Sequence, residues 1–203
     1  KSDLNSIIID AKSGVSGAGR SLKENLLFTE THNTMKAYSP AVHRHSSEIE
    51  YISNQYLNGA YEERENYNSR EYIENYPQAE KKNRAEILFT PHLVPIKRGI
   101  LATIYLNLKE SSSQLEILEL FQQAYSQEAF VQIMKEGLPE IKNVAGSNFA
   151  QIGFKYDQRT ERVIIVSVID NMLKGAAGQA VQNMNVIFGY PENTGLKATA
   201  LFP

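Results

Sequence analysis

Two histidines flank one arginine in the most distinctive chemical pattern of the sequence, His43-Arg44-His45. In an extended segment, side chains two residues apart point to the same face, so both imidazoles could meet one ligand. Imidazole exchanges a proton near neutral pH and also binds metal ions. The pattern indicates acid–base chemistry or substrate binding. It leaves two alternatives open: a metal site of three histidines completed by His92, or histidines with a structural role only.

A glycine-rich loop from Ser13 to Arg20 is the second candidate, and it follows a run of three isoleucines. Its backbone N–H groups, the hydroxyls of Ser13 and Ser16, and the Arg20 guanidinium suit an anion such as phosphate or carboxylate. The glycine spacing, G-x-x-G-x-G, is the reverse of the dinucleotide-binding fingerprint, and no Lys-Ser or Lys-Thr pair follows as in a P-loop. The loop is therefore either an anion site or a tight turn.

Two further polar side chains stand beside a loop and on a helix. Arg98 precedes an expected strand and could hold a carboxylate with its two-pronged guanidinium; the alternative is a surface arginine that caps a loop. The sequence GAAG at 175–178 permits close backbone approach, to a ligand or more commonly to a neighbouring element. Asn183, farther along the same expected helix, offers an amide for hydrogen bonding.

Strands and helices interleave around these residues. The strand pattern occurs at 7–9, 87–91, 99–108, 130–134, 149–156 and 162–169. The last two segments flank a five-residue connection suited to an antiparallel hairpin. A stretch from Met35 to His45 also reads as extended.

Helices are expected at three places. One begins just after His45, where Ser47 and Glu50 fit a capping box; a second follows the serines at 111–113 and reaches Tyr125; the last runs from about 174 to 188. The pattern predicts an α+β fold, with a mixed or antiparallel sheet and helices packed on one face.

Composition removes several classes of function. The chain contains no cysteine, which excludes disulfides, thiolate zinc sites and a cysteine nucleophile within these 203 residues. A net charge of −2 gives no global reason to expect nucleic acid or an anionic membrane as a partner, and no apolar run reaches the roughly 18 residues of a membrane helix. The chain reads as a soluble, cytoplasmic fragment, with a polar excursion at 58–86.

Four motifs in the same order closely resemble N-acetyl-γ-glutamyl-phosphate reductase of arginine biosynthesis. They are DAKSGVSGAGR at 10–20, HRH at 43–45, FTPHLVP at 89–95 with Arg98-Gly99, and KGAAGQAVQNMN at 174–185. The resemblance spans almost the whole chain but only the part of the family that follows the nucleophilic cysteine. An N-terminal NADP-binding domain of roughly 150 residues belongs to the family and is missing here. The implied fold is similar to the C-terminal domain of glyceraldehyde-3-phosphate and aspartate-semialdehyde dehydrogenases.

The resemblance implies a reaction and a role for each matched residue. The family reduces N-acetylglutamyl 5-phosphate with NADPH to N-acetylglutamate 5-semialdehyde and phosphate, through a cysteine thioester. By that resemblance His43 and His45 are the catalytic histidines, and which of them is the base stays open. The substrate-binding candidates are Arg44, Arg98, Ser13 and Arg20, and the cofactor-binding candidates are Ser16, Gly17, Gly19 and Asn183.

The resemblance also implies an organisation and partners. Residues 1–172 would form the substrate-binding and dimerisation domain, and residues 173–203 a C-terminal helix and tail that pack on the missing nucleotide domain. Without that domain the helix would expose an apolar face. The chain would be inactive by itself and part of a homodimer or homotetramer. That face comprises Met172, Ala176, Ala180, Val181, Met184 and Ile187. Two rival functions remain: a non-catalytic dimerisation or binding module, and a histidine-based metal hydrolase.

Overall fold

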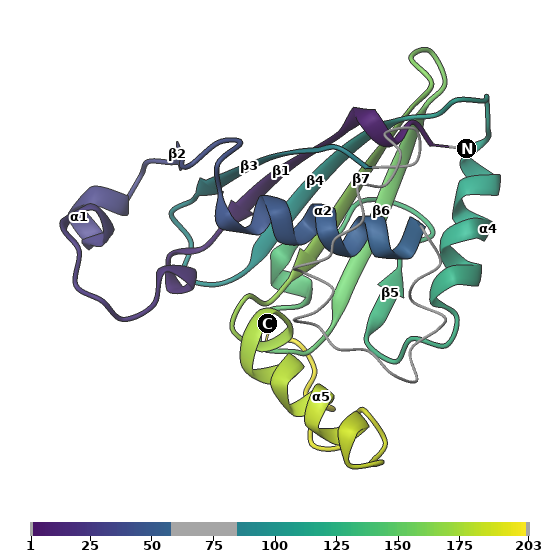
Figure 1. The fold of residues 1–203 in the computed structure, drawn as a ribbon. Coiled ribbons are helices and arrows are strands. Elements are labelled where there is room, and N and C mark those ends of the chain that lie inside the picture. The colour runs from purple at the N-terminus through teal and green to yellow at the C-terminus, as the bar shows by residue number, and fades with distance from the viewer. Residues whose placement is uncertain (1, 58–84, 202–203) are drawn as a thin grey trace, which may run out of the picture.

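A seven-stranded mixed sheet forms the centre of the molecule in the computed structural model, which describes residues 2–57 and 85–201. The strand order across the sheet is β2-β3-β1-β4-β7-β6-β5 (Figure 1). In chain order the strands are β1 (Ile7–Ser13), β2 (Lys36–Ala37), β3 (Ile87–Leu93), β4 (Ile100–Asn107), β5 (Val131–Ile133), β6 (Ala150–Asp157) and β7 (Arg162–Ile169). The helices are α1 (Phe28–Thr31), α2 (Arg44–Leu57), α4 (Gln114–Tyr125) and α5 (Gly178–Ile187).

Strand directions confirm a mixed sheet. β1 pairs with β3 in parallel and with β4 antiparallel, β5 pairs with β6 in parallel, and β4, β7 and β6 are antiparallel neighbours. The expected hairpin is present as β6 and β7, paired from Asp157 opposite Arg162 to Ala150 opposite Ile169. Short 3-10 turns join the larger elements: η1 (Leu4–Ser6), η2 (Val15–Ala18), η3 (Glu24–Leu26) and η5 (Ile141–Asn143).

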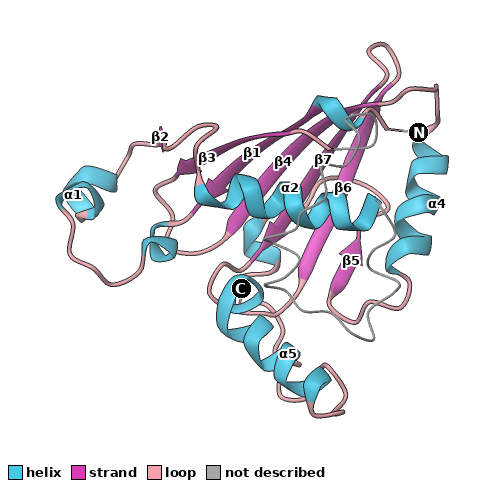
Figure 2. Ribbon diagram, viewed as in Figure 1, coloured by secondary structure: helices cyan, strands magenta, loops and turns pink. Residues whose placement is uncertain are grey.

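Both long helices pack on the same face of the sheet. The strand registers place Ile9, Phe89 and Ile104 side by side, and the same face continues to Ile165 and Phe154. Because side chains alternate along a strand, these residues all point to one side. α2 packs over the first group through Ile49, and α4 packs over the second through Ile117 (Figure 2). The predicted arrangement of helices on one face is confirmed.

The opposite face is open over the β1–β3 half of the sheet. Ile8 and Leu88, which are partners in the parallel register, are 42% and 49% exposed. Toward β6 a loop covers this face, since a Cβ at Gly153 would lie 2.9 Å from Pro139. No helix in the described residues is long and apolar enough to cross a membrane.

The segment before α2 differs from the extended stretch expected at 35–45. Only Lys36–Ala37 is a strand, and the chain then turns at Ser39 and Ala41, whose φ angles are 46° and 59°. Two left-handed residues reverse the chain direction, which brings it from the edge strand onto the helix-covered face. The expectation of an extended His43-x-His45 pair is therefore wrong.

α2 begins at Arg44 rather than after His45, so the expected Ser47–Glu50 capping box is wrong as well. The Ser47 hydroxyl donates to the carbonyl of Arg44 inside the helix. The Glu50 carboxylate instead accepts from the backbone N–H of Ile87, which ties α2 to the start of β3. In α4 the serine cap is confirmed, because Ser113 forms a capping box with Glu116.

The C-terminal helix starts as a π-helical turn, η6 (Leu173–Ala177), and continues as α5. Its expected apolar face is confirmed as exposed, with Met184 at 46% and Ile187 at 77%. The domain boundary predicted at 172–173 falls between the end of β7 and η6; that the following helix packs on a further domain stays a prediction. Of the polar excursion predicted at 58–86, residues 58–84 lie outside the described residues.

Candidate functional site

A cavity of about 480 Å³ opens where β1, β3 and β7 end and β4 begins, beyond the N-terminus of α2. Three distant parts of the chain line it. The glycine loop brings Ser13 and Gly17, the start of α2 brings His43 and His45, and the segment after β7 brings Asn171. The hydrogen-bonding register of the strands aligns these ends, so loops separated by more than a hundred residues meet at one place.

The two histidines of the HRH motif contact each other. Their ring centroids are 4.8 Å apart, and the His43 ring also packs edge-on against Phe89 and Tyr38. His43 Nδ1 accepts a hydrogen bond of 3.2 Å from the backbone N–H of His45, so His43 caps the first turn of α2. A neutral His43 whose Nδ1 is an acceptor carries its proton on Nε2.

Two pKa shifts accompany this geometry. Burial lowers the pKa of His43 below its usual value, and the neighbouring His45 and Arg44 lower it further. His43 is therefore neutral at neutral pH. Burial also raises the pKa of Tyr38, whose phenol keeps its proton and remains a donor at the cavity wall.

The glycine loop does not offer the row of backbone donors that the sequence indicated. The N–H groups of Gly14, Val15 and Ser16 donate to carbonyls of the 96–99 segment, and those of Gly17 and Gly19 donate within the loop. These five donors are not available to an anion, so the backbone part of the anion-site expectation is wrong for them. Gly14 has to be glycine, because a Cβ there would lie 3.0 Å from backbone atoms of residues 96 and 98.

The side chains of the loop divide between the cavity and solvent. Ser13 and Gly17 line the cavity. Ser16 lies behind it, where its hydroxyl accepts a 3.0 Å hydrogen bond from the Asn171 amide. Gly19 and Arg20 are exposed and are not among the cavity-lining residues.

Arg98 is held by a buried carboxylate. Its guanidinium pairs with Asp170 at 2.9 Å, and Asp170 is fully buried. Burial raises the pKa of Asp170, but backbone hydrogen bonds from Gly146, Met172 and Leu173, together with Arg98, outweigh it, so the net pKa lies below the usual value. The pair joins the segment before β4 to the end of β7 and the start of η6. Arg98 does not line the cavity.

The structure brings neither Asn183 nor His92 into the cavity. Asn183 lies on the exposed side of α5 and accepts from the Gln179 amide. His92 alternates with the cavity-lining Pro91 and Leu93, so its side chain points to the opposite face of the sheet, 3.9 Å from Asp10. The three-histidine metal site is therefore excluded, and no other group of three potential ligands occurs in the described part of the chain.

Five polar cavity residues were missed by reading the sequence: Lys23, Asn25, Lys36, Tyr38 and Asn171. The sequence did give a signal for Lys36 and Tyr38. They lie two residues apart in the stretch expected to be extended, so their side chains share a face, and the same stretch leads to the histidines. Asn171 follows the end of β7, where site residues often lie. Its side-chain oxygen Oδ1 accepts a hydrogen bond from the backbone N–H of Gly99. Lys23 stands in a stretch without periodicity and gave no signal.

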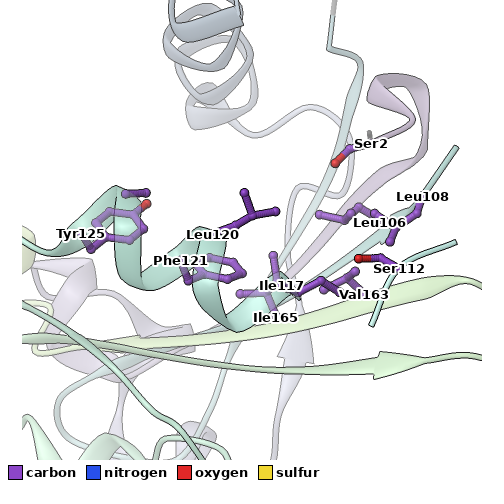
Figure 3. Close-up of a pocket in the computed structure, with 11 residues that line it drawn as sticks. Ser2, Leu106, Leu108, Ser112, Ile117, Leu120, Phe121, Tyr125, Val163 and Ile165 are labelled. Atoms are coloured by element: carbon purple, nitrogen blue, oxygen red, sulfur yellow. The ribbon is translucent and has the colours of Figure 1, made fainter. Parts of the chain in front are cut away.

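A second cavity, of about 310 Å³, lies between α4 and the sheet and has no charged group (Figure 3). Side chains from α4, including Ile117, Leu120 and Phe121, face Leu106 and Val163 across it. Its few polar groups are hydroxyls, so it lacks the acids, bases and cations that the first cavity gathers. The first cavity is the candidate site.

Comparison with known proteins identifies a matching family model and close relatives. Residues 1–65 and 68–171 match the family model described as "Semialdehyde dehydrogenase, dimerisation domain". The protein named N-acetyl-gamma-glutamyl-phosphate reductase of Halothermothrix orenii is 48% identical over 99% of this chain and 52% of its own length. The protein of the same name in Campylobacter jejuni subsp. doylei is 46% identical over 96% of this chain and 50% of its own length. The chain thus spans about half the length of these relatives.

Solved structures agree on the fold. Aspartate semialdehyde dehydrogenase II from Vibrio cholerae, complexed with ASA, aligns with a TM-score of 0.60 at 13% identity, covering 90% of this chain and 54% of that chain. A probable aspartate-semialdehyde dehydrogenase from Pseudomonas aeruginosa aligns with a TM-score of 0.59 at 16% identity, covering the same shares. Since the family model matches most of its length, this chain belongs to the semialdehyde dehydrogenase family, as that family's dimerisation domain.

Proposed function

We propose that this chain is the substrate and dimerisation part of an NADPH-dependent reductase that converts N-acetylglutamyl 5-phosphate to N-acetylglutamate 5-semialdehyde and phosphate, in arginine biosynthesis in the cytoplasm. The observation that carries the proposal is the pair of contacting imidazoles, His43 and His45, in the cavity of a semialdehyde dehydrogenase domain. Relatives named for this reductase are 45–48% identical over nearly the whole chain, which supports the choice of substrate.

His45 is the proton-transfer group in this proposal. His43 Nδ1 is engaged by a backbone N–H, so neutral His43 has its proton on Nε2 and has no free lone pair for a base. His45 in the first turn of α2 has no such constraint. A thioester-forming enzyme needs a base near its thiol, and its tetrahedral intermediate needs a proton donor. His43 then orients the ring of His45 by edge contact.

Substrate contacts in this proposal come from Arg44 and Ser13, which line the cavity with the imidazoles. Arg98 and Arg20 stand outside the lining residues. Arg98 acts through Asp170 by fixing the loop that hydrogen-bonds to the glycine segment. A direct grip of Arg98 on the substrate stays a prediction.

The glycine loop fits a flat cofactor ring. Gly17, Ala18 and Gly19 are exposed at the cavity edge, and nothing lies within 4 Å of a Cβ at Gly19. Ser16 accepts from Asn171, which leaves its own hydroxyl hydrogen free to donate. Gly17, which lines the cavity, would hold the nicotinamide end, with Ser16 behind it and Gly19 beside it in the same loop, whereas Asn183 is separated from them on α5. The bound cofactor supplies the hydride.

The open face of the sheet is the proposed subunit contact, in a homodimer or in a homotetramer built from two such dimers. Ile8 and Leu88 expose apolar surface there, and the matched family model is a dimerisation domain. A second copy would remove this surface from water.

The test uses the complete protein that contains this chain, in the reverse direction. NADP reduction that needs both N-acetylglutamate 5-semialdehyde and inorganic phosphate supports the proposal. The variants His45→Gln and His43→Gln, measured separately in the same assay, check whether the activity belongs to this cavity, since both should lose activity. A complete protein without such activity supports the rival, a non-catalytic dimerisation module.

A further inference from the structure

Positive charge collects at the cavity that holds the histidines. Lys23, Lys36 and Arg44 line it, and no Asp or Glu does among the residues that the structure describes. The whole chain carries a net charge of −2, so this accumulation is local. Cations gathered in a concave site without counter-ions raise the local concentration of anions.

The lysines are free to bind. Neither Lys23 nor Lys36 forms a salt bridge within the described residues. Lys36 Nζ donates to the carbonyl oxygen of Asn25 at 3.4 Å, which draws its ammonium group toward η3, and Lys23 directly precedes η3. An ammonium group has three donors, so Lys36 retains two for a ligand.

Lys36 lies at a distance from the imidazoles along β3. Lys36 pairs with Leu93 on β3, whereas the His43 ring packs on Phe89, four residues earlier on the same strand. Four residues of strand span about 13 Å, so the backbone of Lys36 lies about that far along the sheet from the Phe89 position that the His43 ring contacts. Because Lys36 Nζ is drawn to Asn25 and Lys23 directly precedes the same turn, η3, the cavity has a lysine end at η3 and an imidazole end, where Arg44 also lies. A ligand that satisfies both carries its reacting group at one end and an anion at the other.

We propose that Lys23 and Lys36 bind the carboxylate of the substrate that does not react. This inference rests on the proposed function, in which the substrate carries an acyl phosphate at one end and a carboxylate at the other. The phosphate leaves from the reacting carbon, beside the imidazoles, and the lysines meet the distant carboxylate. The carboxylate does not change during the reaction, so the lysines bind ground state and transition state alike and act on KM.

The experiment measures the complete enzyme in the reverse direction, because semialdehyde and phosphate are then separate substrates. Lys36→Met and Lys23→Met are each expected to raise KM for N-acetylglutamate 5-semialdehyde about tenfold, with KM for phosphate and kcat unchanged. Lys36→Arg retains the charge and should restore most of the affinity. Lys97→Met is the matched control, since Lys97 is exposed and does not line the cavity, and both of its KM values should stay at wild type.

Two outcomes overturn the inference: a rise in KM for phosphate instead of the semialdehyde, or no change in either constant in both lysine variants. If the wild-type enzyme lacks the activity, the proposed function fails, and calorimetric titration with N-acetylglutamate tests the lysines independently. Binding that is weakened by Lys23→Met and Lys36→Met but not by Lys97→Met supports the anion site, and equal binding refutes it. The Lys23 side chain makes no hydrogen bond within the described residues, so Lys23→Met removes none. This variant therefore still tests the inference if Lys36→Met misfolds.

Discussion

His43 and His45 differ in the role that their surroundings permit. One is fixed by a backbone hydrogen bond at the start of α2, and the other is free in the first turn of the same helix. The sequence presented them as equivalent, because adjacency in the HRH motif says nothing about which nitrogen is engaged. The proposed roles, His43 as an orienting residue and His45 as the proton-transfer group, rest on this cap geometry.

Replacing His45 in the complete enzyme should therefore cost more than replacing His43. His45→Gln should lower kcat by roughly two to four orders of magnitude, the usual contribution of general acid–base catalysis. His43→Gln, whose amide oxygen can still cap the helix, should lose less. Steady-state kinetics in both directions checks this order. A larger loss in the His43 variant would exchange the two assignments.

The lowered pKa of His43 predicts the sign of a pH effect. Its usual value is 6.5 and the folded value is lower, so folding favours the neutral ring. The stability contribution of the neutral ring is complete above pH 6.5, and it is lost as the pH falls from there through the folded pKa. An NMR titration should find the His43 midpoint below 6.5. Arg44→Gln removes a repelling charge and should move it upward; a wild-type midpoint above 6.5 would contradict the structure.

The glycine loop and the segment before β4 act together as one element. The first three N–H groups after β1 donate to carbonyls of residues 96, 97 and 99, and Gly14 is in backbone contact with the same segment. Asp170 and Asn171 join this pair of loops to the end of β7, through Arg98 and through Gly99. The cavity wall is therefore set by contacts among three strand ends.

Gly14→Ala should show how closely these loops pack. The added Cβ would press on backbone atoms, which cannot rotate away, and we expect a loss of about 1–3 kcal/mol in the free energy of unfolding. Gly17→Ala is the control, because its Cβ would meet only the side chains of Ser13 and Asn171 at 3.2 and 3.4 Å. Urea denaturation compares the two. Equal losses would show that backbone contact at Gly14 is unimportant.

Asp170→Asn tests the buried ion pair. The substitution retains the shape but removes the charge that balances Arg98, and an amide nitrogen replaces one of the oxygens that accept from backbone N–H groups. We expect destabilisation of about 3 kcal/mol. Arg98 is one-third exposed, so Arg98→Met should cost less. If Arg98→Met instead raises KM for the substrate with no loss of stability, the direct substrate grip replaces the structural role.

At the scale of the whole molecule, the sheet separates two different surfaces. Helices and the cavity occupy one face, and the apolar open face occupies the other. The exposed apolar side of α5 is a further surface, and that it packs on another domain stays a prediction. The open sheet face and the exposed side of α5 are thus the two apolar surfaces that the proposed assembly would cover.

Leu88→Asp should weaken self-association if the open face is the subunit contact. Placing a carboxylate in an apolar contact is costly, so the complete protein should shift from dimers toward monomers in analytical ultracentrifugation. Leu22→Asp is the control, because Leu22 is 90% exposed and lies outside the sheet. An unchanged association state for Leu88→Asp would place the subunit contact elsewhere.

The sequence by itself determined the periodic features. Strand and helix patterns, the serine cap of α4 and the β6–β7 hairpin depend on local alternation and local hydrogen bonds, which neighbouring residues encode. The family followed from long motifs in a fixed order, and residue types alone singled out the HRH motif as a candidate site. These features needed no knowledge of the contacts between distant segments.

Tertiary structure decided which residues share the cavity. Sheet register turned His92 to the opposite face, a buried carboxylate claimed Arg98, and two left-handed residues ended the extended segment early so that α2 begins at Arg44. Tertiary packing brought Lys23, Lys36 and Asn171 into the cavity that also holds the histidines. Such contacts depend on the register of the strands and on which polar groups from distant segments pair with each other. Both are properties of the packed chain rather than of any short stretch of it.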